Sequence, residues 1–126
     1  MVLVETSVWV MAEHGRVDIS RLVPDDDIAI CPPIMLEVLR GVTSQRYRMI
    51  HRMLSRAVML DAPVPLDRFE SAAKLFMVGR DIGITIRSSI NCLIAATAIA
   101  HNVQLLHDDR DFEHMKRIVP LRTITL

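Results

Sequence analysis

Short apolar runs alternate along the chain with longer stretches in which apolar residues recur every three or four positions. A short unbroken apolar run predicts a strand buried on both faces, and the wider spacing predicts a helix with one apolar face. Because strands and helices alternate, the pattern predicts an α/β fold: a three-layer α/β/α sandwich with a central parallel sheet. The expected strands are residues 2–4, 28–31, 58–60, 103–106 and 121–124.

Residues that start and stop helices set the expected helix boundaries. Thr6 or Ser7 is a suitable cap for a helix that begins at Val8. A second helix is expected to start at the proline pair of residues 32–33 and to end at a glycine. The prolines of the segment 62–65 exclude helix there. The later helices are expected at 32–41, 43–57, 66–82, 90–100 (with Ser88 or Ser89 as cap) and 109–117.

Composition narrows the class of partner and the compartment. The 126 residues are expected to form one domain, and a formal net charge of zero provides no overall attraction to nucleic acid or membrane. All but two of the 15 cationic residues are Arg, a bias that suits bidentate contacts to phosphate and that genomic base composition explains equally well. Without a transmembrane-length run or a signal sequence, a cytoplasmic protein is expected. Cys31 and Cys92 are expected to be buried, reduced thiols.

Acidic residues can be sorted by the strand end at which they lie, because ligands of open parallel sheets bind beyond the carboxyl ends of the strands. Glu5 follows the first expected strand, while Asp108 and Asp109 follow the fourth. These three are expected at the functional edge of the sheet. Residues 25–27 are all Asp but precede a strand, so a solvated turn at the opposite edge is their expected role.

Two further polar residues stand in apolar surroundings. Glu37 is the only charged residue in the segment IMLEVL (34–39), and a buried carboxylate must be paired or bound to metal. The alternative is a narrow solvated stripe that Glu37 shares with Arg40. Asn91 lies near the start of an almost wholly apolar helix, where its side chain either bonds back to a cap at Ser88 or reaches the functional edge.

Acids and an amide that converge without a Ser-His-Asp or Cys-His set predict oxygen ligation of a hard divalent cation, Mg²⁺ or Mn²⁺. Such an ion can activate water for attack on a phosphodiester. The five histidines lack metal-ligand spacing and are expected to be structural or surface residues, and among them only His107 adjoins the acids of this edge. A phosphoacceptor receiver domain is excluded because no lysine lies at a late strand end. A dinucleotide-binding domain is excluded because no glycine-rich turn follows the first strand.

Four segments resemble the motifs of PIN-domain ribonucleases, and in particular of the VapC toxins of bacterial toxin–antitoxin pairs, in the family's order and spacing over essentially the whole chain. The segments are VETSVW (4–9), PPIMLEVLRG (32–41), IRSSINCLIAATA (86–98) and LLHDDRDF (105–112). The resemblance implies a PIN-like fold and a pocket that binds Mg²⁺ or Mn²⁺ and hydrolyses RNA. Catalytic and metal-binding roles then fall on Glu5, Glu37, Asn91 and Asp109, with Thr6 and Ser7 as supporting hydroxyls and Asp111 as a further family residue.

Two positions depart from the resemblance, because the family usually has Asp where this chain has Glu5 and Asn91. Glu keeps the charge but adds a methylene, and Asn removes a charge, which leaves three formal negatives rather than four. Weaker metal binding and reduced nuclease activity are therefore expected. The alternative is a catalytically inactive PIN protein, natural or engineered, that retains antitoxin and RNA binding.

The resemblance also implies partners. A VapB-type antitoxin is expected to occupy the acidic pocket with its C-terminal tail. A homodimer is also expected, and Trp9 and Met11 of the first helix either provide its apolar surface or belong to the core. Arg48, Arg52 and Arg56 recur every four residues on one helical face. That face is expected to bind RNA phosphates beside the pocket, to face the antitoxin, or to be solvated.

Overall fold

A parallel sheet lies at the centre of the protein, as a computed structural model of residues 1–126 shows. All strand pairs are parallel, and the order across the five-stranded sheet is β3-β2-β1-β4-β5. This confirms the expected sheet. The strands are β1 (Val2–Val4), β2 (Ile28–Ile30), β3 (Val58–Met59), β4 (Gln104–His107) and β5 (Thr123–Thr125).

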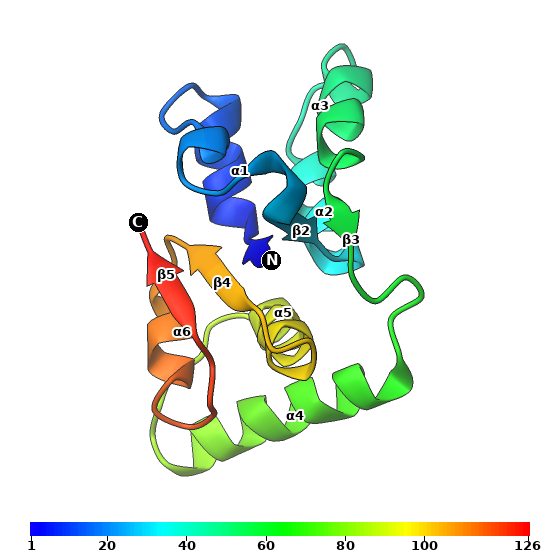
Figure 1. Ribbon diagram of the computed structural model, residues 1–126. Coiled ribbons are helices and arrows are strands. Elements are labelled where there is room, and N and C mark those ends of the chain that lie inside the picture. Colours follow the sequence, from blue (N-terminus) through cyan, green and yellow to red (C-terminus); the bar gives the residue numbers. More distant parts are fainter.

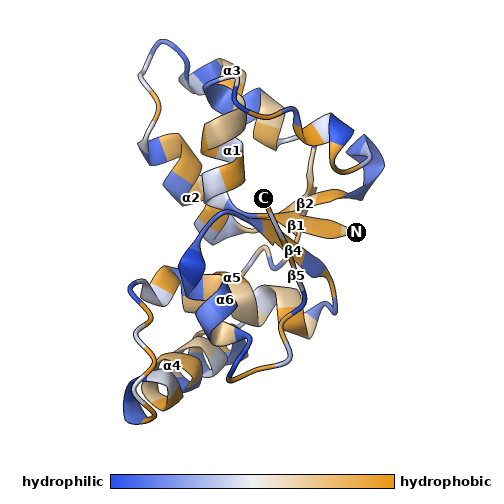
Figure 2. Cartoon of the chain, turned by 90° about the vertical axis from the view of Figure 1, so that its left-hand side faces the viewer, coloured by the Kyte–Doolittle hydropathy of each residue, from blue (hydrophilic) through white to orange (hydrophobic).

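Helices cover both faces of the sheet. In Figures 1 and 2, α1, α2 and α3 lie on one side of it, while α4, α5 and α6 lie on the other. The three-layer arrangement expected from the sequence is therefore confirmed. None of the helices combines the length and the apolar composition needed to cross a membrane. The helices are α1 (Thr6–Glu13), α2 (Pro32–Arg40), α3 (Tyr47–Leu54), α4 (Leu66–Asp81), α5 (Ser89–Ala100) and α6 (Arg110–Met115), with short 3₁₀ helices at Ile19–Arg21 and Asp25–Asp27.

β4 and β5 begin later than expected, because the first expected residue of each forms a turn instead. Val103 was expected to begin the fourth strand, but its N–H donates to Ala98 O (3.0 Å) and so closes the end of α5. Asn102, with φ 53°, makes the reversal. Leu121 likewise donates to Val119 O, which delays β5 to Thr123. The triple Asp segment forms an exposed 3₁₀ turn before β2, close to the solvated turn expected there.

Only part of the apolar spacing that predicts α4 corresponds to its buried face. Ala72 at this spacing is buried, whereas Leu66, Phe69 and Met77 are exposed. The helix packs on α5 through a face that also includes the buried Leu75 and Gly79. A Cβ at Gly79 would lie only 3.0 Å from Ile86 Cδ1 and 3.3 Å from a backbone carbonyl oxygen. Glycine at this position therefore allows the segment 84–86, which follows α4, to approach the helix closely.

Candidate acidic site at the carboxyl edge of the sheet

The two central strands carry the acidic residues to one place. β1 pairs with β4 in parallel, with Val4 opposite Leu106, so both strands end at the same edge. The Glu5 N–H continues the ladder by donating to Leu106 O at 3.0 Å. Glu5 and the segment 107–109 are therefore neighbours, although about 100 residues separate them along the chain.

Glu5 is itself the cap of α1, which corrects the expectation that Thr6 or Ser7 is the cap. Its carboxylate accepts the Ser7 N–H at 2.9 Å and also the Ser7 hydroxyl. The Ser7 Oγ in turn accepts the Asp108 N–H at 3.0 Å. A single hydroxyl thus joins the end of β1 to the loop after β4.

Burial raises the pKa of Glu5 from its usual 4.5 to about 7. Two bonds from Ser7 oppose this rise in pKa, whereas the negative charges of Asp109 and Glu37 add to it. The side chain is only 3% exposed, so little water reaches the carboxylate. Near neutral pH, Glu5 is therefore poised between its protonated and ionised forms.

Glu37 faces the same place from α2. The Thr6 hydroxyl donates to Glu37 Oε1 at 2.9 Å, and this bond joins the first turn of α1 to the second helix. Arg40 lies at the limit of an ion pair, with its Nη2 4.0 Å from Glu37 Oε2. The carboxylate is partly buried, with its side chain 18% exposed, and it belongs to the acidic group rather than to a fully solvated stripe.

Asn91 reaches the functional edge instead of bonding back to its helix cap. Ser88 is the cap of α5, as expected, and accepts the Asn91 backbone N–H at 3.4 Å. The side-chain Nδ2, however, donates to Asp109 Oδ2 and to Asp111 Oδ2, each at 3.1 Å. Two carboxylate acceptors fix the orientation of the amide, whose NH₂ group holds the two acids together.

Asp111 anchors the start of α5. Its carboxylate is 2% exposed and accepts the N–H groups of Arg87 and Ser88 at distances of 3.1 to 3.2 Å. The Arg87 guanidinium lies 3.6 Å from Asp111 Oδ1 and 3.7 Å from Asp109 Oδ1. Sequence reasoning missed Arg87, because no periodicity distinguishes it from the other exposed arginines. Asp109 caps α6 and accepts the Asp111 N–H at 2.9 Å.

The donors at this edge fit a hard divalent cation by chemistry, since all the charged ones are carboxylates and the rest are hydroxyls and an amide. No three His, Cys, Asp or Glu side chains are grouped closely enough to hold a metal ion as they stand. Each carboxylate instead has an oxygen engaged by a neighbour: Glu5 by Ser7, Glu37 by Thr6, and Asp109 by Asn91 and the Asp111 N–H. Metal binding would therefore require these side chains to turn toward one ion.

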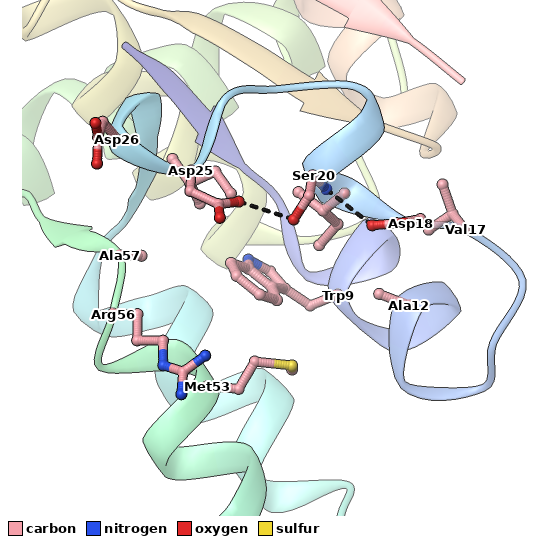
Figure 3. A pocket seen from close by; sticks show the side chains of 12 residues that line it. Trp9, Ala12, Val17, Asp18, Ser20, Asp25, Asp26, Met53, Arg56 and Ala57 are labelled. Atoms are coloured by element: carbon pink, nitrogen blue, oxygen red, sulfur yellow. Dashed lines mark hydrogen bonds between the residues drawn. The ribbon is translucent and has the colours of Figure 1, made fainter.

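One cavity lies at the opposite edge of the sheet, among residues that precede β2 and β3. Figure 3 shows Trp9 at its centre, between the segment that carries Asp18 and Asp25 and the side chains of Met53 and Arg56 from the region of α3. Arg56 therefore lines this cavity, while Arg48 and Arg52 are exposed on α3. A role for these arginines in RNA binding stays a prediction.

Trp9 and the cysteines belong to the core. Trp9 is 4% exposed, and its Nε1 donates to Val4 O at 2.9 Å. It therefore cannot form the apolar dimer surface expected on the first helix. Cys31 and Cys92 are buried and free, as expected. Burial raises the pKa of Cys31 to about 12 and that of Cys92 to about 11, so neither thiol supplies a nucleophile at neutral pH.

Comparison with known proteins agrees with this geometry. The family profile described as the PIN domain matches residues 2–118. The VapC ribonuclease Mb1587 of Mycobacterium bovis and the ribonuclease VapC11 of Mycobacterium tuberculosis are each 33% identical over 130 residues, covering 97% of this chain and 96% of theirs.

Solved structures share the fold at lower identity. The match to VapBC2 from Rickettsia felis, bound to a DNA fragment from their promoter, has a TM-score of 0.75 at 22% identity and covers 100% of this chain and 99% of that one. The match to DNA-bound VapBC from Salmonella typhimurium has a TM-score of 0.79 at 13% identity, with coverage of 98% and 96%.

Proposed function

Because the chain belongs to the PIN-domain family and, within it, to the VapC ribonucleases, we propose that it is a divalent-metal-dependent endoribonuclease and the toxin of a toxin–antitoxin pair. The observation that carries the proposal is the meeting of Glu5, Glu37 and Asp109 beyond the carboxyl ends of β1 and β4. The charges of Glu37 and Asp109 are close enough to raise the pKa of Glu5. Such mutual repulsion between carboxylates is relieved when a cation binds among them.

Glu5, Glu37 and Asp109 would hold Mg²⁺ or Mn²⁺, with the amide of Asn91 at its side. The bound ion would neutralise charge on the phosphodiester and lower the pKa of the attacking water. Glu5 must lose its proton before it can bind metal, so a pKa of about 7 makes its occupancy sensitive to pH near neutrality. Thr6 and Ser7 hold the Glu37 and Glu5 carboxylates in place through their hydroxyls.

The two departures from the family pattern favour a weak metal site. The NH₂ group of Asn91 donates to Asp109 and Asp111, so it satisfies these acids where an Asp would have added a fourth negative charge. Glu5 caps α1, so its carboxylate is already held by Ser7. We therefore propose that nuclease activity is reduced in this chain. The second candidate is a PIN protein that binds antitoxin and RNA without cleaving RNA.

The VapBC names of the structural neighbours support a VapB-type antitoxin as the partner. For the expected homodimer, we propose α4 in place of the first helix. Its stripe of Leu66, Phe69 and Met77 is 74%, 50% and 44% exposed. Leu66, Phe69 and Met77 are three and eight positions apart, which places them on one side of the helix, and exposed apolar residues on one side of a helix suit packing against a second helix.

The test compares Mn²⁺-dependent RNA cleavage by four proteins: the chain as it stands, Glu5→Asp, Asn91→Asp and the double variant. We expect activity to rise with each substitution and to be highest in the double variant. Glu37→Gln in the double variant is the matched control and should abolish cleavage. Equal activity in all four proteins would overturn the proposed impairment. No cleavage by any of them, together with no Mn²⁺ site by calorimetry, would favour the non-catalytic candidate.

A further inference from the structure

His107, the last residue of β4, is fully buried, with 0% of its side chain exposed, and it has a partner on each ring nitrogen. Nδ1 accepts the Asp109 N–H at 3.0 Å. Since this nitrogen is an acceptor, the ring proton of the neutral imidazole lies on Nε2, which faces Glu113 Oε2 at 3.2 Å. The ring also packs on Phe112, with ring centroids 5.1 Å apart.

The far side of the ring is tied to the edge strand. Glu113 Oε2 accepts the Thr123 hydroxyl at 2.9 Å, and Thr123 is the first residue of β5. β5 in turn pairs with β4, so that His107 lies opposite Thr125. The chain of bonds Thr123–Glu113–His107–Asp109 therefore joins the edge of the sheet to the backbone of an acidic site residue.

The hydrogen bond to His107 satisfies the Asp109 backbone N–H, which neither β4 nor α6 pairs. Asp109 comes after the end of β4 and before the first turn of α6, so neither element provides an acceptor for its N–H. A buried N–H without an acceptor costs free energy, and a fixed acceptor holds the backbone to which the carboxylate is attached.

We propose that His107 is a positioning residue, which sets the place of the Asp109 carboxylate by accepting its backbone N–H while Glu113 and Thr123 hold the ring. This inference rests on the proposed metal site for its functional consequence, but the hydrogen-bond pattern can be tested without metal. Groups that orient metal ligands in this way typically contribute 10- to 100-fold to metal affinity.

Three variants separate positioning from simple packing. His107→Leu fills the space but offers no acceptor. His107→Asn places an amide oxygen where Nδ1 lies, and Thr123→Val leaves the ring in place but frees Glu113. In the Glu5→Asp and Asn91→Asp background, we expect His107→Leu to weaken Mn²⁺ binding by roughly 10-fold or more, measured by calorimetry. His107→Asn should restore affinity to within a few-fold of its parent, and Thr123→Val should lie between them.

His101→Leu is the matched control, because His101 bonds to Asp61 and not to the acidic group. It should leave Mn²⁺ affinity unchanged. The proposal would be overturned if a folded His107→Leu variant bound Mn²⁺ as tightly as its parent. It would also be overturned if His107→Asn did not restore Mn²⁺ affinity. In the unsubstituted chain, ¹⁵N NMR should show an unprotonated His107 Nδ1 and an Asp109 amide shifted by imidazole. A proton on Nδ1 would overturn the proposal even if the protein binds no metal, whereas loss of metal binding in the parent alone would count against the proposed function only.

Discussion

Asn91→Asp is the substitution whose outcome follows most directly from the geometry. In this chain the Asn91 NH₂ group donates to two carboxylates, each at 3.1 Å, from a side chain that is 5% exposed. The substitution replaces that NH₂ group by a carboxylate oxygen. Two favourable charge-assisted bonds then become two contacts between acids, at a position where Asn91 and Asp111 are almost wholly buried. Without metal, we expect a large loss of stability.

The new carboxyl can stay ionised or take up a proton. The response that costs less free energy sets the loss of stability. If the new carboxyl stayed ionised, each acid at about 4 Å would cost roughly 4 kcal/mol at an effective dielectric constant near 20. Uptake of a proton is cheaper, because moving its pKa from about 3.9 to 7 or above costs roughly 4 kcal/mol at pH 7. The protonated group has one hydrogen for two acceptors, so about 1.5 kcal/mol more is lost with the second bond. The expected loss at pH 7 is therefore roughly 5–6 kcal/mol.

The sign of the pH dependence distinguishes this explanation from lost packing. The folded-state pKa of the new carboxyl lies above its unfolded value, so the protonation cost is absent below about pH 3.9 and grows by about 1.4 kcal/mol per pH unit above it. Urea unfolding in EDTA at several pH values between about 4 and 7 measures this slope. Saturation with Mn²⁺ at about 100 times its Kd should recover about 2.7 kcal/mol.

Asn91→Ala is the control, since it removes both bonds without adding a charge. Its loss of stability relative to the unsubstituted chain should not vary with pH. A pH-independent loss in Asn91→Asp, or a stability equal to that of the unsubstituted chain at pH 7 in EDTA, would refute the reasoning.

Three further outcomes are expected. Because the pKa of Glu5 is about 7, Mn²⁺ affinity should rise about tenfold per pH unit below pH 7 and level off above it, measured by calorimetry; a flat profile would contradict this. Gly79→Ala should lower the free energy of unfolding by about 1–3 kcal/mol, measured with urea, since its Cβ would be 3.0 Å from a side-chain carbon. Gly41→Ala should lower it far less, because the nearest atom to its Cβ would be 3.6 Å away. Phe69→Asp should convert the proposed α4 dimer to monomer in analytical ultracentrifugation without loss of fold, and an unchanged mass would count against that surface.

The sequence was sufficient for the sheet and for the location of the acids. Strands that are buried on both faces must be apolar throughout, so their short runs stand out from the helical spacing. Once the strands are known to be parallel, the position of Glu5 and Asp109 after two of them places both at one edge. The register of β1 and β4 then makes them neighbours, as observed.

Details that depend on packing could not be predicted in the same way. The pattern of α4 contains apolar residues around more than one face, and only its packing against α5 shows which face is buried. The direction of the Asn91 amide depends on two acids far along the chain. Glu5 caps α1 because its carboxylate accepts the N–H of Ser7, and the sequence alone does not show this contact.

The pairing of β1 with β4 also has a consequence for how the chain is made. β1 is translated about 100 residues before its partner strand β4, a delay of roughly 5–20 s at ordinary elongation rates. Until then β1 lacks β4, one of its two neighbouring strands, and Asp109 is not yet near Glu5 and Glu37. A nascent chain therefore cannot carry a complete acidic site. The acidic site is completed only when the segment that carries Asp109 has left the ribosome and β4 has paired with β1.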